Sequence, residues 1–161
     1  MKIHLRLLIL LIINIWATTA LAASPTRYFE ELSTEPHFDY SYISPTMLRM
    51  MGDNYLSNSS QEYNLPIQCK DLSFIENVTT SSNGHQDELW KIIRQIKKEH
   101  HMETLTTKKS TNYRYDVLVT LTKDGKKITN LMVITQNGPF STEVIYMEGK
   151  IPLESIQNSF Y

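Results

Sequence analysis

The sequence has little cysteine, no excess charge of one sign and no recognisable catalytic signature. Cys69 is the one cysteine among 161 residues, so an internal disulfide is excluded and stability must come from packing. Sixteen basic residues against seventeen acidic ones give a net charge of −1. This balance does not provide the basic surface on which nucleic-acid binding usually rests, so no nucleic-acid partner is expected.

Long apolar runs are also absent, except at the start of the chain. Residues 1–6 carry two basic side chains, residues 7–16 are almost wholly apolar, and Ala20-Leu21-Ala22 gives the small-x-small pattern that signal peptidase cuts. The apolar stretch is shorter than the ~20 residues of a membrane-spanning helix. The sequence therefore predicts a cleavable signal peptide over residues 1–22, with no transmembrane segment after cleavage. Because Ala23 rather than a cysteine then comes first, no lipid anchor is expected.

Residues 23–161, which remain after cleavage, have the size of a single domain. Loss of Lys2 and Arg6 leaves 14 basic residues against 17 acidic ones, a net charge of about −3. A chain of ~140 residues buries around two-thirds of its unfolded surface, which is enough for one hydrophobic core. We therefore expect one domain, with a polar loop over residues 53–70.

Apolar residues in this domain recur with a period of two in some segments and of about 3.6 in others. The period of two predicts strands at residues 38–43, 72–78, 102–108, 113–122, 128–135 and 140–147. Helical segments are predicted near residues 28–32, 45–56, 84–101 and 152–156. Ser44 is expected to cap the second helix, and Asn83 to form a capping box with Gln86 at the third. Gly149 is expected to end the last strand.

Two tight-turn signals connect the later strands. Asp124-Gly125 and Asn137-Gly138 are favoured hairpin turns, so the last four strands are expected to form an antiparallel meander. The element order is strand, helix, strand, helix, four strands, helix. It predicts an α+β fold, with an antiparallel sheet of five to six strands and two to three helices packed mainly on one face.

Three segments carry a family resemblance. Residues 42–51 (Tyr-Ile-Ser-Pro-Thr-Met-Leu-Arg-Met-Met) follow an aromatic strand, residues 72–78 form the next strand, and Leu131-Met-Val-Ile with residues 149–156 (Gly-Lys-Ile-Pro-Leu-Glu-Ser-Ile) closes the domain. In this order the chain resembles the domain-of-unknown-function family 4252, which occurs in exported proteins of Gram-negative bacteria. The resemblance implies an exported bacterial protein and assigns no catalytic or binding residue.

Three histidines are candidate metal ligands at the ends of the long helix. His85 lies before this helix, and His100 and His101 end it with Glu99 and Glu103 nearby, and transition metals bind imidazole and carboxylate. However, adjacent helical side chains point about 100° apart, and basic residues at a helix C-terminus already complement the dipole.

A hydrolase would pair a histidine with an acid and with a serine or Cys69. The sequence contains no Gly-x-Ser-x-Gly elbow and no signature around Cys69. A metal-dependent or hydrolytic enzyme that uses the His100 region is therefore kept as the alternative function, and no cofactor is predicted.

Four tyrosines form a candidate binding surface, because tyrosine offers a large apolar face with a polar end. Tyr40 and Tyr42 belong to the first strand, and Tyr113 and Tyr115 to the fourth. An uncovered sheet face would present them to a ligand or partner; otherwise they belong to the core and the sheet edge. Cys69 is either a buried core residue or a thiol available for an intermolecular disulfide.

The leading hypothesis from the sequence is an exported envelope protein, periplasmic or secreted, without enzymatic activity. It would bind another envelope protein or a small ligand through the sheet face or an edge strand. The oligomeric state is left open, with a monomer as the working expectation.

Overall fold

The computed structural model describes residues 26–54, 66–82 and 84–157. The predicted signal peptide and most of the predicted polar loop lie outside these ranges. Among the described residues, no helix has the length and apolar character needed to cross a membrane.

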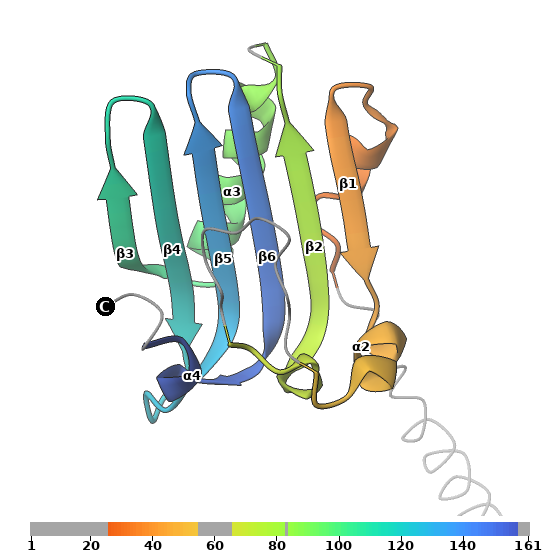
Figure 1. The fold of residues 1–161 in the computed structure, drawn as a ribbon, viewed down its shortest axis with the longest axis vertical. Helices are drawn as coiled ribbons and strands as arrows, with labels where there is room; N and C mark the ends of the chain where they lie inside the picture. The colour runs from red at the N-terminus through yellow and green to blue at the C-terminus, as the bar shows by residue number, and fades with distance from the viewer. Residues whose placement is uncertain (1–25, 55–65, 83, 158–161) are drawn as a thin grey trace, which may run out of the picture.

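Six antiparallel strands form one sheet in the order β1-β2-β6-β5-β4-β3 (Figure 1). The strands are β1 Phe38–Ile43, β2 Leu72–Thr80, β3 Glu103–Lys109, β4 Tyr113–Leu121, β5 Lys127–Asn137 and β6 Ser141–Pro152. The last four are neighbours in chain order, which confirms the predicted meander. β1 pairs with β2, and β2 pairs with β6. The two N-terminal strands therefore extend the sheet beyond β6. The predicted α+β class is confirmed.

The strands are accompanied by three α-helices and two 3₁₀ helices in the described part. The α-helices are α2 Pro45–Met51, α3 Gln86–Glu99 and α4 Leu153–Gln157, and the 3₁₀ helices are η1 Glu30–Thr34 and η2 Cys69–Asp71. α3 is strongly amphipathic, because Leu89, Ile93 and Ile96 form its buried stripe. Acidic residues in its first turn and lysines in its last turn complement the helix dipole.

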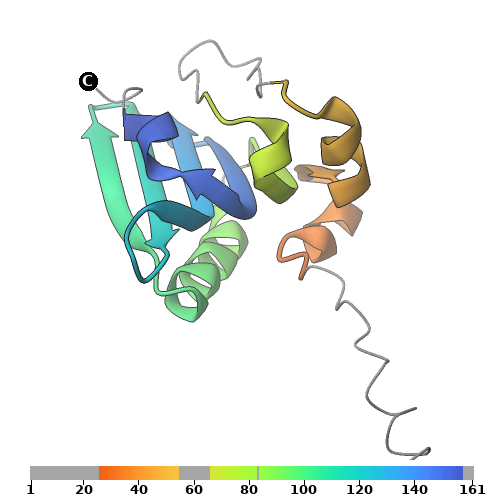
Figure 2. The ribbon, with the colours of Figure 1, turned by 90° about the horizontal axis from the view of Figure 1, so that it is seen from below.

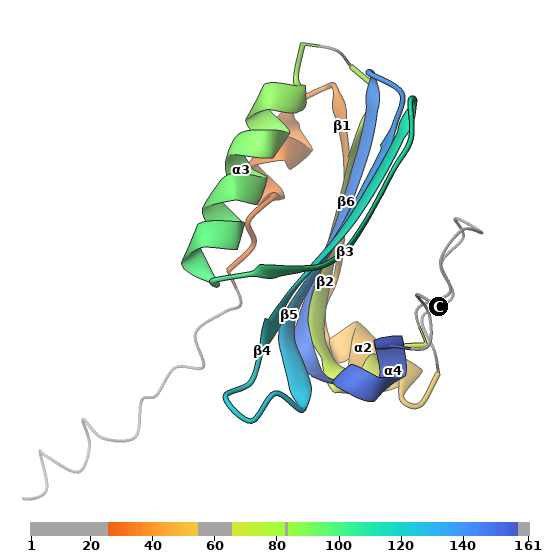
Figure 3. The ribbon, with the colours of Figure 1, turned by 90° about the vertical axis from the view of Figure 1, so that its left-hand side faces the viewer.

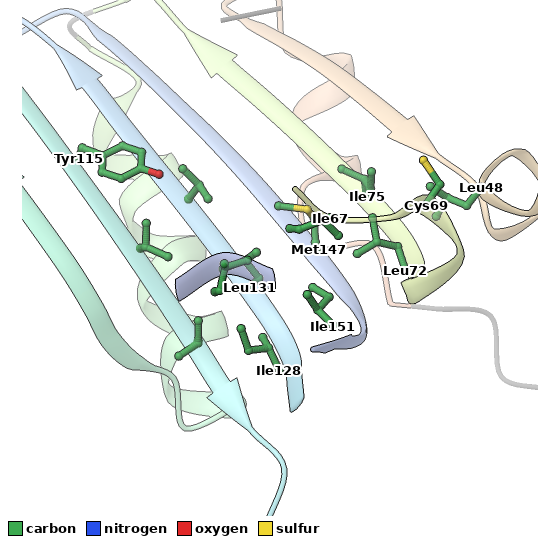
Figure 4. Close-up of a cluster of buried hydrophobic side chains, with 14 residues drawn as sticks. Leu48, Ile67, Cys69, Leu72, Ile75, Tyr115, Ile128, Leu131, Met147 and Ile151 are labelled. Carbon is green, nitrogen blue, oxygen red and sulfur yellow. The ribbon is translucent and has the colours of Figure 1, made fainter. Parts of the chain in front are cut away.

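Both faces of the sheet are apolar. Side chains alternate across each strand, so in β4 Leu118 joins the cluster under α3 and η1, while Val117 and Val119 join a cluster on the opposite face. Figure 3 shows α3 on one side of the sheet and α2 and α4 near one end of the other side, and Figure 2 shows the same layers end-on. Figure 4 shows the cluster on the α2 and α4 side, where side chains from β2, β4, β5 and β6 pack together.

The helices are therefore divided between the two faces. The prediction that they pack mainly on one face holds for α3, the longest helix, and for η1. α2, η2 and α4 instead supply Leu48, Cys69 and Ile156 to the opposite cluster. Ile67, in the segment before η2, belongs to the same cluster.

The last strand does not end at Gly149, contrary to the prediction. β6 continues through Gly149 to Pro152, and Gly149 pairs with Leu72 of β2 beside a register shift. A Cβ atom at Gly149 would overlap the carbonyl oxygen of Asp71 and lie 2.9 Å from the Cα atom of Leu72. The glycine is thus needed for a close approach of two backbones rather than for a chain break.

The helix caps agree with the sequence at one helix and differ at another. Ser44 caps α2, because its Oγ atom accepts a hydrogen bond from the Met47 N–H at 3.2 Å, as predicted. α3 begins at Gln86 with His85 at the N-cap position and no side-chain cap. Asn83, the predicted cap, lies outside the described residues.

Replacement of Gly149 should be more costly than replacement of another glycine. Gly149→Ala is expected to destabilise the fold by about 1–3 kcal/mol, since the added methyl group overpacks against the backbone of residues 71–72. Gly84→Ala is the matched control, because nothing lies within 4 Å of a Cβ atom built there. Urea unfolding of both variants measures the difference, and equal stabilities would contradict the close approach.

Candidate functional site

His100, the residue at the centre of the enzyme hypothesis, lies in a network of tyrosine and glutamate side chains. Its Nε2 atom is 2.6 Å from the Tyr28 hydroxyl and 3.3 Å from the Tyr146 hydroxyl. The Tyr28 hydroxyl donates to Glu99 at 3.0 Å, and the Tyr146 hydroxyl donates to Glu148 at 2.7 Å. The ring of Tyr28 also packs edge-on against His100 and Tyr146. His100 thus connects the end of α3 to the N-terminal segment and to β6.

The pair of adjacent histidines has a structural role at the end of α3. His100 is the C-cap, and His101 follows it with a left-handed φ of 50°. The Met102 N–H bonds to the Lys97 carbonyl at 2.9 Å and the His101 N–H to the Lys98 carbonyl at 3.4 Å. These two bonds form a Schellman motif, which usually places a glycine where His101 stands. His101 is exposed, so the two imidazoles face different surroundings.

The three candidate histidines do not come together. His85 lies at the other end of α3, a helix of 14 residues and so roughly 21 Å long. It stacks on His37, with ring centroids 4.1 Å apart. In the ranges described by the structure, no three His, Cys, Asp or Glu side chains are placed to hold a metal ion together.

A buried carboxylate, Glu76 of β2, holds the N-terminal segment against the sheet. Its Oε2 atom accepts a hydrogen bond from the Tyr28 N–H at 3.0 Å. Its Oε1 atom accepts from the Phe29 N–H at 3.2 Å and from the Tyr40 hydroxyl at 3.0 Å. Glu76 is fully buried. Three donors therefore converge on one carboxylate beside the His100 network.

Burial raises the pKa of several titratable groups in this region. Burial raises the pKa of Glu76, although the N–H groups of Phe29 and Tyr28 act in the opposite direction. Burial also raises the pKa of Tyr28, Tyr40 and Tyr146, and a neighbouring carboxylate adds to the shift in each case. These hydroxyls consequently remain neutral donors at physiological pH.

The four predicted tyrosines do not share one surface. Tyr40 and Tyr42 pack against the cluster on the α3 side of the sheet, whereas Tyr113 and Tyr115 belong to the cluster on the opposite face. Tyr115 is fully buried and lies over β4 among aliphatic side chains (Figure 4). Tyr113 lines a polar cavity of about 380 Å³ between the β3–β4 and β5–β6 turns. A common aromatic surface is therefore not formed.

Cys69 is a core residue. Its side chain is fully buried between α2 and β2, next to Leu48 and Ile75 (Figure 4). Burial raises the pKa of its thiol, which disfavours the reactive thiolate. The geometry thus favours the first of the two roles considered for Cys69, that of a small buried apolar residue.

A groove of about 180 Å³ runs between α3 and strands β3, β4 and β5. Its floor is formed by buried aliphatic side chains, namely Ile93, Leu118 and Ile134. Trp90 lies half-buried in its wall, and Thr104 and Thr107 line it from β3. We call this cavity the α3–β4 groove.

Basic side chains predominate at the α3–β4 groove. Arg94, Lys97 and Arg114 line it, against a single acid, Asp116. Asp116 is engaged already, since its carboxylate accepts from Arg114 Nε at 2.6 Å and from the Thr107 hydroxyl at 2.8 Å. The guanidinium of Arg114 also lies 5.7 Å from the centre of the Trp90 ring, a cation–π contact. The groove therefore combines an apolar floor with an excess of positive charge.

Comparison with known proteins places the chain in a family. Residues 29–159, which include all of the sheet, match the family described as a domain of unknown function, DUF4252. The chain belongs to this family. No curated protein and no solved structure matches the chain. The predicted resemblance is confirmed, and the DUF4252 match brings no assigned site with it.

Sequence reasoning missed the α3–β4 groove of this DUF4252 domain. Trp90, Ile93, Arg94 and Lys97 recur at positions i, i+3, i+4 and i+7 of α3, and so they follow one side of the helix. This spacing was a usable signal for a shared helix side. The contribution of β3 and β4 was not visible in the sequence, because it depends on where α3 crosses the sheet.

The stability contribution of Glu76 should depend on pH. Because its pKa is raised in the folded protein, the native state holds the proton more tightly than the unfolded chain. Its contribution is then largest below the ordinary glutamate pKa of about 4.3 and falls as the pH rises through the native pKa. Glu76→Gln cannot titrate. The stability of the wild type relative to this variant is expected to decrease with rising pH in urea unfolding between pH 4 and pH 8. A relative stability that grows with pH would show that the hydrogen bonds outweigh the burial.

Proposed function

We propose that this DUF4252 protein is an exported, non-enzymatic binding module of the bacterial envelope, and that its ligand occupies the α3–β4 groove. The observation that carries the proposal is the lining of the groove. An apolar floor lies beside basic side chains, two of which, Arg94 and Lys97, have no hydrogen bond or ion pair within the described residues. Ligand sites typically combine an apolar lining with a few polar groups that fix orientation.

The His100 network supports a structural role rather than an enzymatic one. Its imidazole is placed between two tyrosine hydroxyls, and these hydroxyls in turn bind Glu99 and Glu148. A general acid or base must come within hydrogen-bond reach of a substrate. His100 does not line the α3–β4 groove, the polar cavity beside Tyr113 or the hollow beside His37. The network instead holds the N-terminal segment, α3 and β6 together.

Export is supported by the predicted signal peptide over residues 1–22. The family resemblance points in the same direction, because it implies exported proteins of Gram-negative bacteria. Because position 23 is an alanine and not a cysteine for lipid attachment, we place the exported protein in the periplasm or outside the cell, without a lipid anchor.

The proposal is tested first by expressing the full-length gene in a Gram-negative host. Protein released by osmotic shock is expected to begin at Ala23, as read by intact mass. Product that retains Met1 and stays in the cytosol would remove the exported part of the proposal.

The same purified protein then tests the groove. A protein-free, small-molecule fraction of periplasmic extract is expected to raise the melting temperature of the wild type, because a ligand that binds only the native state stabilises it. Thr104→Phe, which fills the groove from β3, should abolish the increase. Thr106→Phe is the matched control, since Thr106 belongs to the same strand but does not line the groove. Equal increases in both variants, or none in the wild type, would contradict the proposed site.

A further inference from the structure

We propose that the ligand of the α3–β4 groove is a small organic carboxylate, with its acid group between Arg94 and Lys97 and a short apolar body on the groove floor. This inference rests on the proposed function, because it assigns a chemical class to the ligand of the same groove.

One side of α3 carries two positive charges, those of Arg94 and Lys97, that no acidic residue of the helix balances. Arg94 and Lys97 are three positions apart, and like charges at this spacing destabilise a helix. The residues three and four positions from Arg94 on either side are Trp90, Lys91, Lys97 and Lys98, so no acid on the helix can neutralise it. Lys97 at least complements the helix dipole in the last turn, whereas Arg94 lies further from the end. A bound anion would relieve this repulsion.

The one acidic side chain of the groove, Asp116, is already hydrogen-bonded to neighbouring residues and does not pair with Arg94 or Lys97. Asp116 is 4% exposed, and both its oxygens are occupied by Arg114 and Thr107. Arg114 is thereby neutralised, but no acid within residues 26–54, 66–82 and 84–157 pairs with Arg94 or Lys97. A charge-assisted hydrogen bond from either of them to a ligand carboxylate would be stronger than one between neutral groups.

The groove is small and its floor is apolar, which indicates a small ligand with an apolar body. Ile93, Leu118 and Ile134 offer an apolar surface next to the cations, which suits a molecule with one charged end. The volume of about 180 Å³ is below the 300–1,000 Å³ of typical pockets for drug-sized ligands. The apolar body of the ligand is accordingly short.

An extended peptide paired with β3 is less well supported than a small molecule, although β3 is an edge of the sheet. Its pairing with β4 is interrupted by a register shift between Thr104 and Thr106. Exposed lysines, Lys108 and Lys109, occupy its end. Bulges and lysines are features by which edge strands avoid pairing with another chain.

The test uses the fluorescence of Trp90 in the exported protein that begins at Ala23, in which Trp90 is the one remaining tryptophan because Trp16 is removed with the predicted signal peptide. The protein is titrated with hexanoate, 1-hexanol and hexylamine, three probes with the same apolar body. Hexanoate is expected to change the Trp90 emission with a dissociation constant at least tenfold lower than those of the other two. In Arg94→Gln/Lys97→Gln this tenfold preference should disappear.

The control variant is Lys91→Gln/Lys98→Gln, which removes the same amount of charge from exposed positions of α3 that do not line the groove. It should retain the preference for hexanoate. Loss of the preference in the control would show a general effect of net charge and would overturn the inference. Equal binding of hexanoate and hexanol would also overturn it, while leaving the groove as a binding site. A Trp90 emission that responds to none of the probes would remove both the inference and the proposed groove.

Discussion

The structure depends on one constraint: the sheet is apolar on both faces, so both faces must be covered. Antiparallel sheets commonly leave one face to water, with polar side chains on it. Here the central strands carry buried apolar residues on either side, such as Leu118 and Val117 in β4. α3 and η1 cover one face, and the short helices α2 and α4 with η2 pack at one end of the other. On the first face, α3 packs against buried side chains that include Leu118 of β4 and Ile134 of β5, and the groove lies between the helix and these strands.

Two buried carboxylates on the α3 side of the sheet, Glu76 and Asp116, hold neighbouring segments against the sheet. Glu76 receives three hydrogen bonds from the N-terminal segment and β1, and it fixes the chain that precedes the sheet. Asp116 pairs with Arg114 and Thr107 at the opposite edge of the sheet. Removal of one partner leaves a buried charge without its hydrogen bond, which lowers the free energy of unfolding considerably. These two groups therefore specify how the N-terminal segment and the β3–β4 hairpin lie on the sheet.

Local patterns in the sequence predicted the elements well and their spatial relations less well. The period-two segments and the Asp124-Gly125 and Asn137-Gly138 turns were sufficient for the meander, because hairpins join neighbouring strands. The face on which Tyr40 and Tyr113 lie was not predictable, since β1 and β4 are separated in the sheet and their relative register depends on the strands between them. Gly149 was misread as a strand end because a close approach of two backbones leaves no local pattern. The position of His101 in a Schellman motif was not predicted, because glycine usually occupies that position.

The sequence likewise predicted one part of the candidate site and missed another. The sequence offered His100 as a candidate metal ligand and as the centre of the alternative enzyme hypothesis, and the structure places it at the junction of three elements, in contact with two tyrosine hydroxyls. It did not identify the α3–β4 groove, because two of the three floor residues, Leu118 and Ile134, come from strands far from α3 in the chain. The groove nevertheless joins an apolar surface to two basic side chains, Arg94 and Lys97, that have no partner acid among the described residues.

The most direct test of the account is a map of ligand-induced amide shifts by two-dimensional NMR with hexanoate as the probe. The account predicts that the shifts concentrate in α3 between Trp90 and Lys97 and in the facing parts of β3 and β4. Shifts confined to the opposite face of the sheet, around Asn77 and Ile145, would contradict it.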